Sequence, residues 1–172
     1  MPELPEAQAL SERIDERLGG ATLVRLEPLA FSALKTVLPP PEELYGHVLV
    51  GVGRRGKFLI FDFATARLLV HLSQGGRVDF EEAKKSTRPR GGVLRMTFDR
   101  LPAVLVKEFG TERKAGWWVL PADEDGPLSK LGPDPFSEEF AELIRSGSET
   151  RRLHAMLRDQ RVVAGIGRGY SD

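Results

Sequence analysis

Residues 47–72 read HVLVGVGRRGKFLIFDFATARLLVHL, and this stretch contains three of the segments that decide the fold. Segments 47–52, 58–63 and 67–72 are short, rich in β-branched or aromatic residues, and bounded by Gly, Pro or Asp. These features are typical of β-strands. The chain holds further segments of the same kind, which are 22–26, 93–98, 103–106 and 116–120. The pattern predicts an antiparallel β-sandwich.

Helices are predicted before and after this sandwich. The residues Leu4, Ala7, Leu10, Ile14 and Leu18 recur at helical spacing, and Gly19-Gly20 then ends the helix. After a linker at 131–135, segments 137–145 and 149–158 indicate two helices separated by Ser146-Gly147-Ser148. We therefore expect an α+β protein. Residues 1–128 would form the β-sandwich domain flanked by helices, and residues 129–172 would begin an all-α domain.

Composition narrows the class of protein. The 172 residues are 41% hydrophobic, which suffices for a packed core. No apolar stretch approaches a membrane span, and the first residues lack the basic and apolar regions of a secretory signal, so we expect a cytoplasmic protein with no membrane partner. The chain has no cysteine, and His47, His71 and His154 show no ligand spacing. We therefore expect neither a disulfide nor a metal site.

Charge is balanced overall but uneven along the chain. The formal net charge is zero, which argues against a protein that coats nucleic acid indiscriminately. The basic clusters are Arg54, Arg55 and Lys57; Lys84, Lys85, Arg88 and Arg90; Arg113 and Lys114; and Arg151, Arg152, Arg158, Arg161 and Arg168. Any one of these clusters, taken singly, is more often a solvated surface than a binding site. Together they are compatible with one groove if the fold brings them together.

The first six residues, Met1-Pro2-Glu3-Leu4-Pro5-Glu6, carry the clearest chemical signal. A proline after the initiator permits removal of Met1, which would leave Pro2 with a free secondary amine. Such an amine can attack an electrophilic carbon and form an iminium. Glu3 and Glu6 would lie at the start of the following helix, where they could donate and accept protons. Taken alone, however, the segment also fits ordinary helix initiation and capping.

Two further motifs decide between these interpretations. Gly53-Arg54-Arg55-Gly56-Lys57-Phe58 places a lysine and two arginines between glycines, just ahead of an apolar strand. Residues 159–172, DQRVVAGIGRGYSD, have the pattern of a helix-two-turns-helix motif. Together with the first six residues, these motifs resemble the formamidopyrimidine-DNA glycosylase and endonuclease VIII family of base-excision repair enzymes. Segment 31–36 resembles an actinobacterial branch of that family.

The resemblance implies a bifunctional DNA glycosylase and abasic-site lyase that acts as a monomer on damaged double-stranded DNA. It implies that Pro2 attacks C1′ of the damaged nucleotide and forms a Schiff base. Glu3 would protonate or stabilise the opening sugar, Glu6 would help hold the site and the extruded base, and Lys57 would contact a phosphate and take part in proton transfer. The DNA-binding residues that the resemblance implies are Arg54, Arg55, Gln74, Arg113, Lys114, Gly165, Gly167, Arg168 and Tyr170.

The chain departs from the family where side chains fill the gap left by an extruded base. In the best-known branch a methionine follows a His-Leu strand end, and an Arg-Arg-Phe-Gly turn supplies an arginine and a phenylalanine. This chain has His71-Leu72-Ser73-Gln74 at the first place and residues 110–115, GTERKA, at the second. We therefore expect Gln74 and Arg113 to take these places, without an aromatic wedge. Arg168 stands where the family has a phosphate-binding asparagine, and arginine can also bind phosphate.

The chain ends at Asp172, where the next family helix should begin, so we expect a fragment of a longer protein. A C-terminal zinc finger, if the full protein has one, would lie outside this chain, and we expect no cofactor within it. One alternative stays open, namely a non-catalytic homologue that binds damaged DNA but has lost productive lesion handling, as Gln74 and Arg168 would permit. The intact set Pro2, Glu3, Glu6 and Lys57 favours the enzyme.

Overall fold

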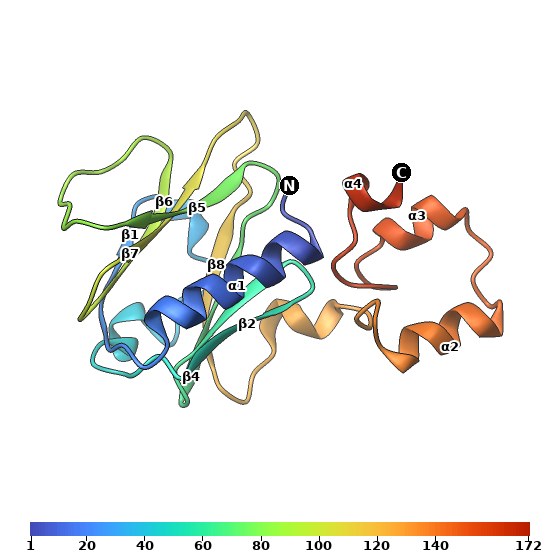
Figure 1. The fold of residues 1–172 in the computed structure, drawn as a ribbon, viewed down its shortest axis with the longest axis horizontal. Coiled ribbons are helices and arrows are strands. Elements are labelled where there is room, and N and C mark those ends of the chain that lie inside the picture. Colours follow the sequence, from blue (N-terminus) through green and yellow to red (C-terminus); the bar gives the residue numbers. More distant parts are fainter.

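Eight β-strands form two four-stranded antiparallel sheets in the computed structural model, which describes all 172 residues. The first sheet has the strand order β1 (Leu23–Pro28), β6 (Gly92–Phe98), β7 (Ala103–Glu108) and β5 (Gly76–Glu81). The second has the order β2 (Gly51–Arg55), β3 (Phe58–Asp62), β4 (Ala66–His71) and β8 (Gly116–Pro121). The sheets enclose one apolar core in which Phe61, Phe63 and Trp117 are fully buried (Figure 1). The predicted α+β fold with a β-sandwich is confirmed.

The stretch that predicted the sandwich supplies three consecutive strands of the second sheet. Leu59 and Phe61 of β3 point into the core between the sheets, because alternate side chains of a strand face opposite sides. Phe58 instead lies on the outer face with Leu69 and Leu120, where partly buried apolar side chains from the segment after β8 cover them. Since both faces of this sheet are covered, its strands form nearly continuous apolar runs in the sequence.

Helix α1 (Leu4–Leu18) covers the side of the sandwich along β2. Its buried stripe consists of Leu4, Ala7, Ser11, Ile14 and Leu18, which confirms the predicted helix. Asp15 Oδ1 accepts a hydrogen bond from Val52 N of β2 at 2.8 Å, and Gly19 N ends the helix on Asp15 O at 2.8 Å. These contacts fix the last turns of the helix against the start of β2.

Two strand predictions need correction. The strand predicted over 47–52 begins only at Gly51, because the preceding residues bond to the segment before β1: Leu23 N donates to His47 O, and Leu49 N donates to Ala21 O. Strand β5 was not predicted. It is the edge strand of its sheet, and the polar residues Arg77 and Asp79 alternate with its apolar ones, so its sequence lacks an apolar run.

The helical part lies beside the sandwich and contains α2 (Glu138–Ser146), α3 (Leu153–Arg158) and α4 (Arg168–Ser171) (Figure 1). Short 3₁₀ helices span Phe31–Ala33, Pro41–Leu44 and Gly126–Lys130. Helix α2 matches its prediction, with Ser137 as its N-cap. Helix α3 begins at Leu153 and not at residue 149, because the Glu149 carboxylate bonds the backbone N–H and guanidinium of Arg151 and holds this segment out of a helix. The predicted boundary after residue 128 falls between β8 and α2.

No helix of the structure combines the length and the apolar character that a membrane span requires.

Candidate active site

The two ends of the chain meet at Glu3. This residue is 4% exposed, and its carboxylate accepts hydrogen bonds from Gly167 N at 2.6 Å and from Gly169 N at 2.7 Å. Leu4 N donates to Gly165 O at 2.9 Å beside them, and Figure 1 shows the N-terminus next to α4. Because a buried charge needs compensating hydrogen bonds, this contact both orients Glu3 and docks the C-terminal segment on α1.

The glycines of the C-terminal segment permit this close approach. Gly165 adopts φ +114°, and a β-carbon there would lie 2.9 Å from Leu4 Cδ1. A β-carbon on Gly167 would lie 2.7 Å from Glu3 Oε1 and 2.7 Å from Lys57 Nζ. The sequence suggested that these glycines admit a DNA phosphate, which stays a prediction. In the structure the group that they admit is the start of the chain, with the Glu3 carboxylate on two backbone N–H groups.

Glu6 is held by a second contact between the two ends. Its carboxylate accepts hydrogen bonds from Tyr170 Oη at 3.0 Å and from Glu3 N at 3.1 Å. Burial alone would raise the pKa of Glu6, but the hydrogen bonds from its own backbone, from Tyr170 and from Glu3 outweigh burial and lower that pKa. Glu6 therefore stays ionised and ties Tyr170 to the first turn of α1.

Lys57 and His71 complete the cluster. Lys57 follows Gly56 in the turn between β2 and β3, and His71 of β4 pairs with Phe58 of β3. Burial lowers the pKa of Lys57, the Glu3 charge opposes this shift, and Arg158 adds to it. Burial and the neighbouring Lys57 charge lower the pKa of His71 to about 4, so its imidazole is neutral at physiological pH. The site therefore sets the Glu3 carboxylate, which directly follows Pro2, close to the Lys57 ammonium group, with the neutral His71 imidazole next to Lys57.

The buried imidazole predicts a specific acid sensitivity. His71 has a folded-state pKa of about 4 against an ordinary value of 6.5, so between these pH values the unfolded chain binds a proton that the folded chain does not. The free energy of unfolding should therefore fall as the pH drops through this window, by roughly 3 kcal/mol for such a shift. His71→Gln should remove this part of the fall, which urea unfolding of both proteins at several pH values would measure. An equal fall in the variant would assign the effect to another group.

Two loops lie close to this cluster. Gln74 is exposed in the turn between β4 and β5, and Phe109, 45% exposed, begins the loop after β7. Phe109 N donates to Gly75 O at 3.1 Å, and a β-carbon on Gly75 would lie 2.0 Å from Phe109 O. The backbones of the two loops are thus in direct contact. The segment matched to the family turn, residues 110–115, holds no aromatic side chain, and Phe109 lies one residue before it, so the absence of an aromatic wedge stays a prediction.

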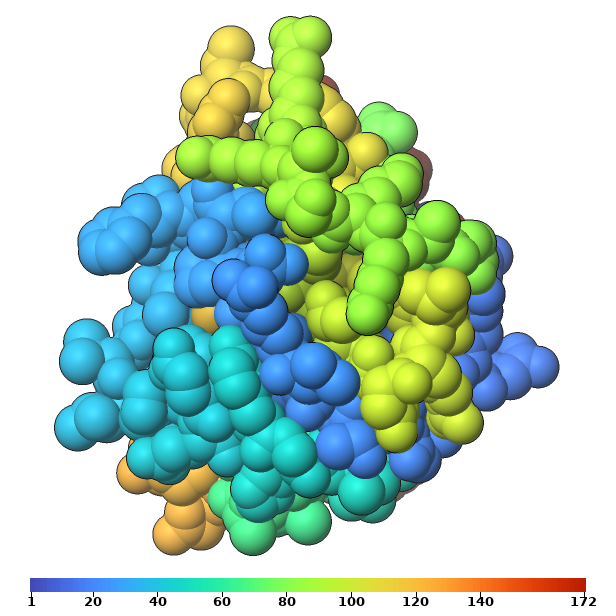
Figure 2. All heavy atoms as spheres, turned by 90° about the vertical axis from the view of Figure 1, so that its left-hand side faces the viewer, coloured from blue at the N-terminus to red at the C-terminus, as the bar shows by residue number.

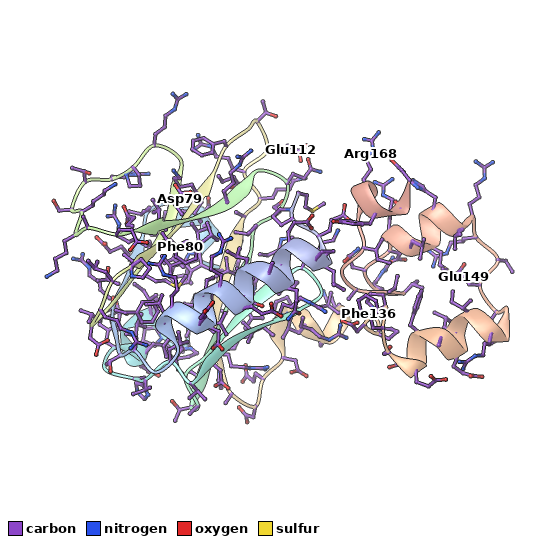
Figure 3. The ribbon with its side chains drawn as sticks, viewed as in Figure 1. Asp79, Phe80, Glu112, Phe136, Glu149 and Arg168 are labelled. Carbon is purple, nitrogen blue, oxygen red and sulfur yellow. The ribbon has the colours of Figure 1, made fainter.

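The rest of this loop presents basic side chains to solvent. Arg113 and Lys114 are exposed, and Lys114 Nζ lies 2.9 Å from Glu112 Oε2. The buried Glu108 carboxylate accepts hydrogen bonds from Lys114 N at 2.8 Å and Ala115 N at 2.9 Å, which fixes the loop's return. In Figure 3, Glu112 and Arg168 lie on the same side of the molecule, one on the sandwich and the other on the helical part.

Arg54 and Arg55 lie between the two parts of the chain and not on an open surface. Arg54 donates to Gln8 Oε1 at 2.8 Å and pairs with Asp134 Oδ2 at 3.0 Å, and its side chain is only 11% exposed. Arg55 donates to Gly132 O at 2.6 Å. Both guanidinium groups therefore hold the segment after the sandwich against α1 and β2, and their contact with DNA stays a prediction.

Arg168 and Tyr170 have opposite surroundings. The Arg168 side chain is 82% exposed, and its closest acidic neighbour is Asp172 at 3.9 Å. The Tyr170 hydroxyl instead donates a hydrogen bond to the Glu6 carboxylate. Sequence reasoning named both, but it missed His71 and Phe109. No local sequence pattern indicates that His71 is buried beside Lys57, whereas the Phe109-Gly110 pair can be read directly from the sequence.

No three or more His, Asp or Glu side chains gather in a way that could hold a metal ion.

Comparison with known proteins gives consistent matches. The family model for the formamidopyrimidine-DNA glycosylase N-terminal domain matches residues 1–118. The formamidopyrimidine-DNA glycosylase of Nitrobacter winogradskyi is 34% identical over 193 residues, which cover 99% of this chain and 64% of that protein. The Bacillus subtilis protein is 31% identical over 182 residues, which cover 100% of this chain and 64% of that protein. The chain thus spans about 64% of the length of these curated relatives.

Solved structures match over nearly the whole chain. Lactococcus lactis Fpg in complex with DNA that contains an abasic site has a TM-score of 0.86 and 27% identity, covering 99% of this chain and 65% of that one. MutM in complex with DNA that contains carbocyclic 8-oxo-G has a TM-score of 0.85 and 27% identity, with 99% and 65% covered. The likeness therefore includes both the sandwich and the helical part.

Proposed function

Because this chain belongs to the formamidopyrimidine-DNA glycosylase family, we propose that it acts in base-excision repair of damaged DNA as a bifunctional DNA glycosylase and abasic-site lyase. The observation that carries the proposal is the position of Glu3. Its carboxylate directly follows Pro2, is fixed by two backbone N–H groups, and lies close to Lys57. A fixed carboxylate next to a potential amine nucleophile is the arrangement that imine chemistry requires.

The proposed reaction starts from removal of Met1, which frees the secondary amine of Pro2. The amine nitrogen attacks C1′, the glycosidic bond breaks, and the base leaves with the bonding electrons and takes up a proton from water. The sugar ring opens as O4′ takes up a proton, which leaves an iminium between Pro2 and C1′. The iminium makes the C2′ proton acidic, so loss of that proton expels the 3′ phosphate. A second elimination can then expel the 5′ phosphate.

The neighbouring side chains take distinct parts in this scheme. The Glu3 carboxylate, next in the chain to the attacking nitrogen, takes up the proton that this nitrogen loses after the attack and delivers it to O4′. Lys57 holds the phosphate beside the lesion, and its lowered pKa suits it to proton transfer better than an exposed lysine. His71 is neutral at physiological pH, so it can donate one hydrogen bond without adding charge. Glu6 and Tyr170 are positioning residues that hold the first turn of α1.

Access of Pro2 to C1′ requires the nucleotide to leave the duplex, and side chains must fill the gap. Phe109 is exposed on a loop fixed to the Gln74 turn, so we place the aromatic ring and the Gln74 amide in that gap. Arg113 would face the orphaned base. Lys114 on the sandwich and Arg168 on the helical part are exposed, and each would contact a DNA phosphate. The damaged double-stranded DNA would lie between these two parts of the chain.

Borohydride trapping on a duplex with one abasic site tests this function. A Schiff base is reduced to a stable amine, so the expected result is a covalent protein–DNA species. A matched duplex whose abasic aldehyde has been reduced beforehand should bind without being trapped. If the chain binds both duplexes and traps neither, it is the non-catalytic homologue, and the proposed chemistry is wrong.

A further inference from the structure

Strand β5 has a free edge. It is the last strand of its sheet, and β7 is the only strand that pairs with it. The edges of the other outer strands are covered: Val52 N of β2 donates to Asp15 Oδ1, and Lys35 N donates to Trp117 O of β8. At β1, Leu26 bonds the Tyr45 hydroxyl through both its N–H and its C=O. An uncovered edge is therefore particular to β5, and such an edge is a template for a further strand.

The register of β5 against β7 identifies the backbone groups on this edge. Phe109 N donates to Gly75 O, so every second residue of β7 before Phe109 turns its backbone toward β5. The residues of β5 opposite these positions are Arg77, Asp79 and Glu81. The N–H and C=O groups of Val78 and Phe80 therefore point away from the sheet, and no group of the protein bonds them.

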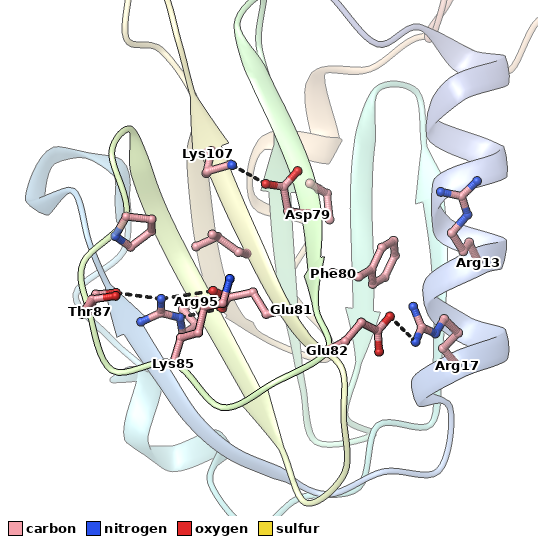
Figure 4. A pocket seen from close by; sticks show the side chains of 13 residues that line it. Arg13, Arg17, Asp79, Phe80, Glu81, Glu82, Lys85, Thr87, Arg95 and Lys107 are labelled. Atoms are coloured by element: carbon pink, nitrogen blue, oxygen red, sulfur yellow. Dashed lines mark hydrogen bonds and ion pairs between the residues drawn. The ribbon is translucent and has the colours of Figure 1, made fainter.

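A groove of about 750 Å³ lies along this edge, between β5 and α1 (Figure 4). The Phe80 ring lines it on one side, and the Arg17 guanidinium lies 5.2 Å from the centre of that ring. Arg13 extends from the preceding turn of α1 toward the same strand (Figure 4). The groove thus has a strand edge as one wall and two arginines of a helix as the other.

The charges that line the groove are unbalanced. Its three acidic side chains each have a basic partner, in the pairs Asp79–Lys107, Glu81–Arg95 and Glu82–Arg17. Arg13 and Lys85 also line the groove, are exposed, and belong to no ion pair. Lys85 is part of segment 82–91, which projects from the surface in Figure 2 (yellow-green). Two positive charges therefore remain, which complements a partner with carboxylates.

We propose that the β5 edge is an interaction surface for an extended acidic segment of a partner protein, which pairs with Val78 and Phe80 as an added strand. Free N–H and C=O groups in alternation match another peptide backbone. Every second side chain of the added strand would lie on the side of Phe80, next to Arg13 and Arg17, so carboxylates belong at these positions.

Two other occupants fit this surface less well. Phosphates of a nucleic acid accept hydrogen bonds but do not donate them, so they leave the C=O groups of Val78 and Phe80 unpaired, and the carboxylates in the groove repel them. A second copy of the chain would bring the unpaired Arg13 and Lys85 of two grooves together. An acidic peptide meets neither difficulty.

This surface is separate from the candidate active site. Arg13 follows Glu3 by ten residues, which is roughly 15 Å along the axis of a helix. The interaction goes beyond the proposed repair function and does not depend on it. Arg13→Gln should therefore trap an abasic site as the wild type does, and a loss of trapping would contradict this separation.

Amide exchange measures the pairing directly. In the free protein the amide hydrogens of Val78 and Phe80 should exchange faster than those of Arg77 and Asp79, which β7 already pairs. The probe is a seven-residue peptide of alternating Thr and Glu with blocked ends. At saturation it should slow exchange at Val78 and Phe80 by roughly tenfold, the effect of one hydrogen bond, and leave Arg77 and Asp79 unchanged.

Matched controls separate backbone pairing from charge, with fluorescence anisotropy as the readout. N-methylation of the peptide amides on the pairing side keeps the charge but removes the donors, and should weaken binding by roughly tenfold or more. A peptide of alternating Thr and Lys should not bind. Arg13→Gln should weaken binding of the Glu peptide by roughly twofold to fivefold. Arg152→Gln, which removes the same charge from the helical part, should leave it unchanged.

Several results would overturn the proposal. Equal binding of the Glu and Lys peptides, or of the Glu peptide and its N-methylated form, would contradict strand addition by an acidic segment. Protection of Val78 and Phe80 by a short single-stranded oligonucleotide, and not by the peptide, would assign the groove to nucleic acid. Sedimentation that shows a dimer, with Val78 and Phe80 protected until it dissociates, would assign the edge to a second copy.

Discussion

Replacing Pro2 by glycine should lower the rate of strand cleavage at an abasic site by roughly a hundredfold to a thousandfold, with a matching loss of the trapped species. A secondary amine gives an iminium that is cationic without further protonation, whereas the primary amine of glycine gives an imine that must first bind a proton. Glycine is also more flexible, so the nitrogen is held less firmly beside Glu3. Single-turnover cleavage and borohydride trapping measure the two losses.

Pro5→Gly is the matched control for Pro2→Gly. Pro5 lies in the first turn of the same helix, so this variant weakens the start of α1 without altering the amine. Its cleavage rate should stay within a few-fold of the wild type. Mass spectrometry of the trapped wild-type complex should place the sugar on the nitrogen of Pro2. A sugar found on a lysine, with Pro2→Gly trapping as well as the wild type, would disprove the mechanism.

Glu3→Gln should slow base excision by roughly a hundredfold or more, and it should slow cleavage of a preformed abasic site less, because that substrate has already lost its base. The structure adds a second expectation. Gly167 N and Gly169 N donate to the two carboxylate oxygens, so an amide would turn its own N–H groups toward one of these donors. The cost of that buried mismatch is about 1–3 kcal/mol, and it should loosen the C-terminal segment.

Separating these two effects requires a variant that disturbs only the docking. Tyr170→Phe removes the hydrogen bond to Glu6 and leaves Glu3 in place. Amide exchange at Gly167 and Gly169 reports docking in both variants. If Tyr170→Phe loosened these amides as much as Glu3→Gln and lost base excision equally, Glu3 would act through docking alone, and its assigned proton transfer would be wrong.

Much of the fold followed from short-range patterns. The apolar runs of β3, β4, β6 and β8 and the stripe on α1 depend on the spacing of neighbouring residues, which any reader of the chain can count. Strand β5 was not predicted because an edge strand with alternating polar residues has no such apolar run. The start of α3 was predicted too early because the hydrogen bond from Arg151 N to the Glu149 carboxylate outweighs the weak helix propensity of this segment.

The sequence by itself determined the sandwich, the helix after Pro2, and the motifs that mark Pro2, Glu3 and Lys57 as candidate catalytic residues. Only the tertiary structure decided which charged side chains are free to act. Arg54 has its partner 80 positions away at Asp134, and Glu3 has its partner 164 positions away at Gly167. Arg54 consequently has an ion-pair partner within the protein, while Arg88 and Arg90 remain exposed on the segment between β5 and β6. The physical reason is that hydrogen bonds and ion pairs depend on distances in space, which short-range sequence patterns do not contain.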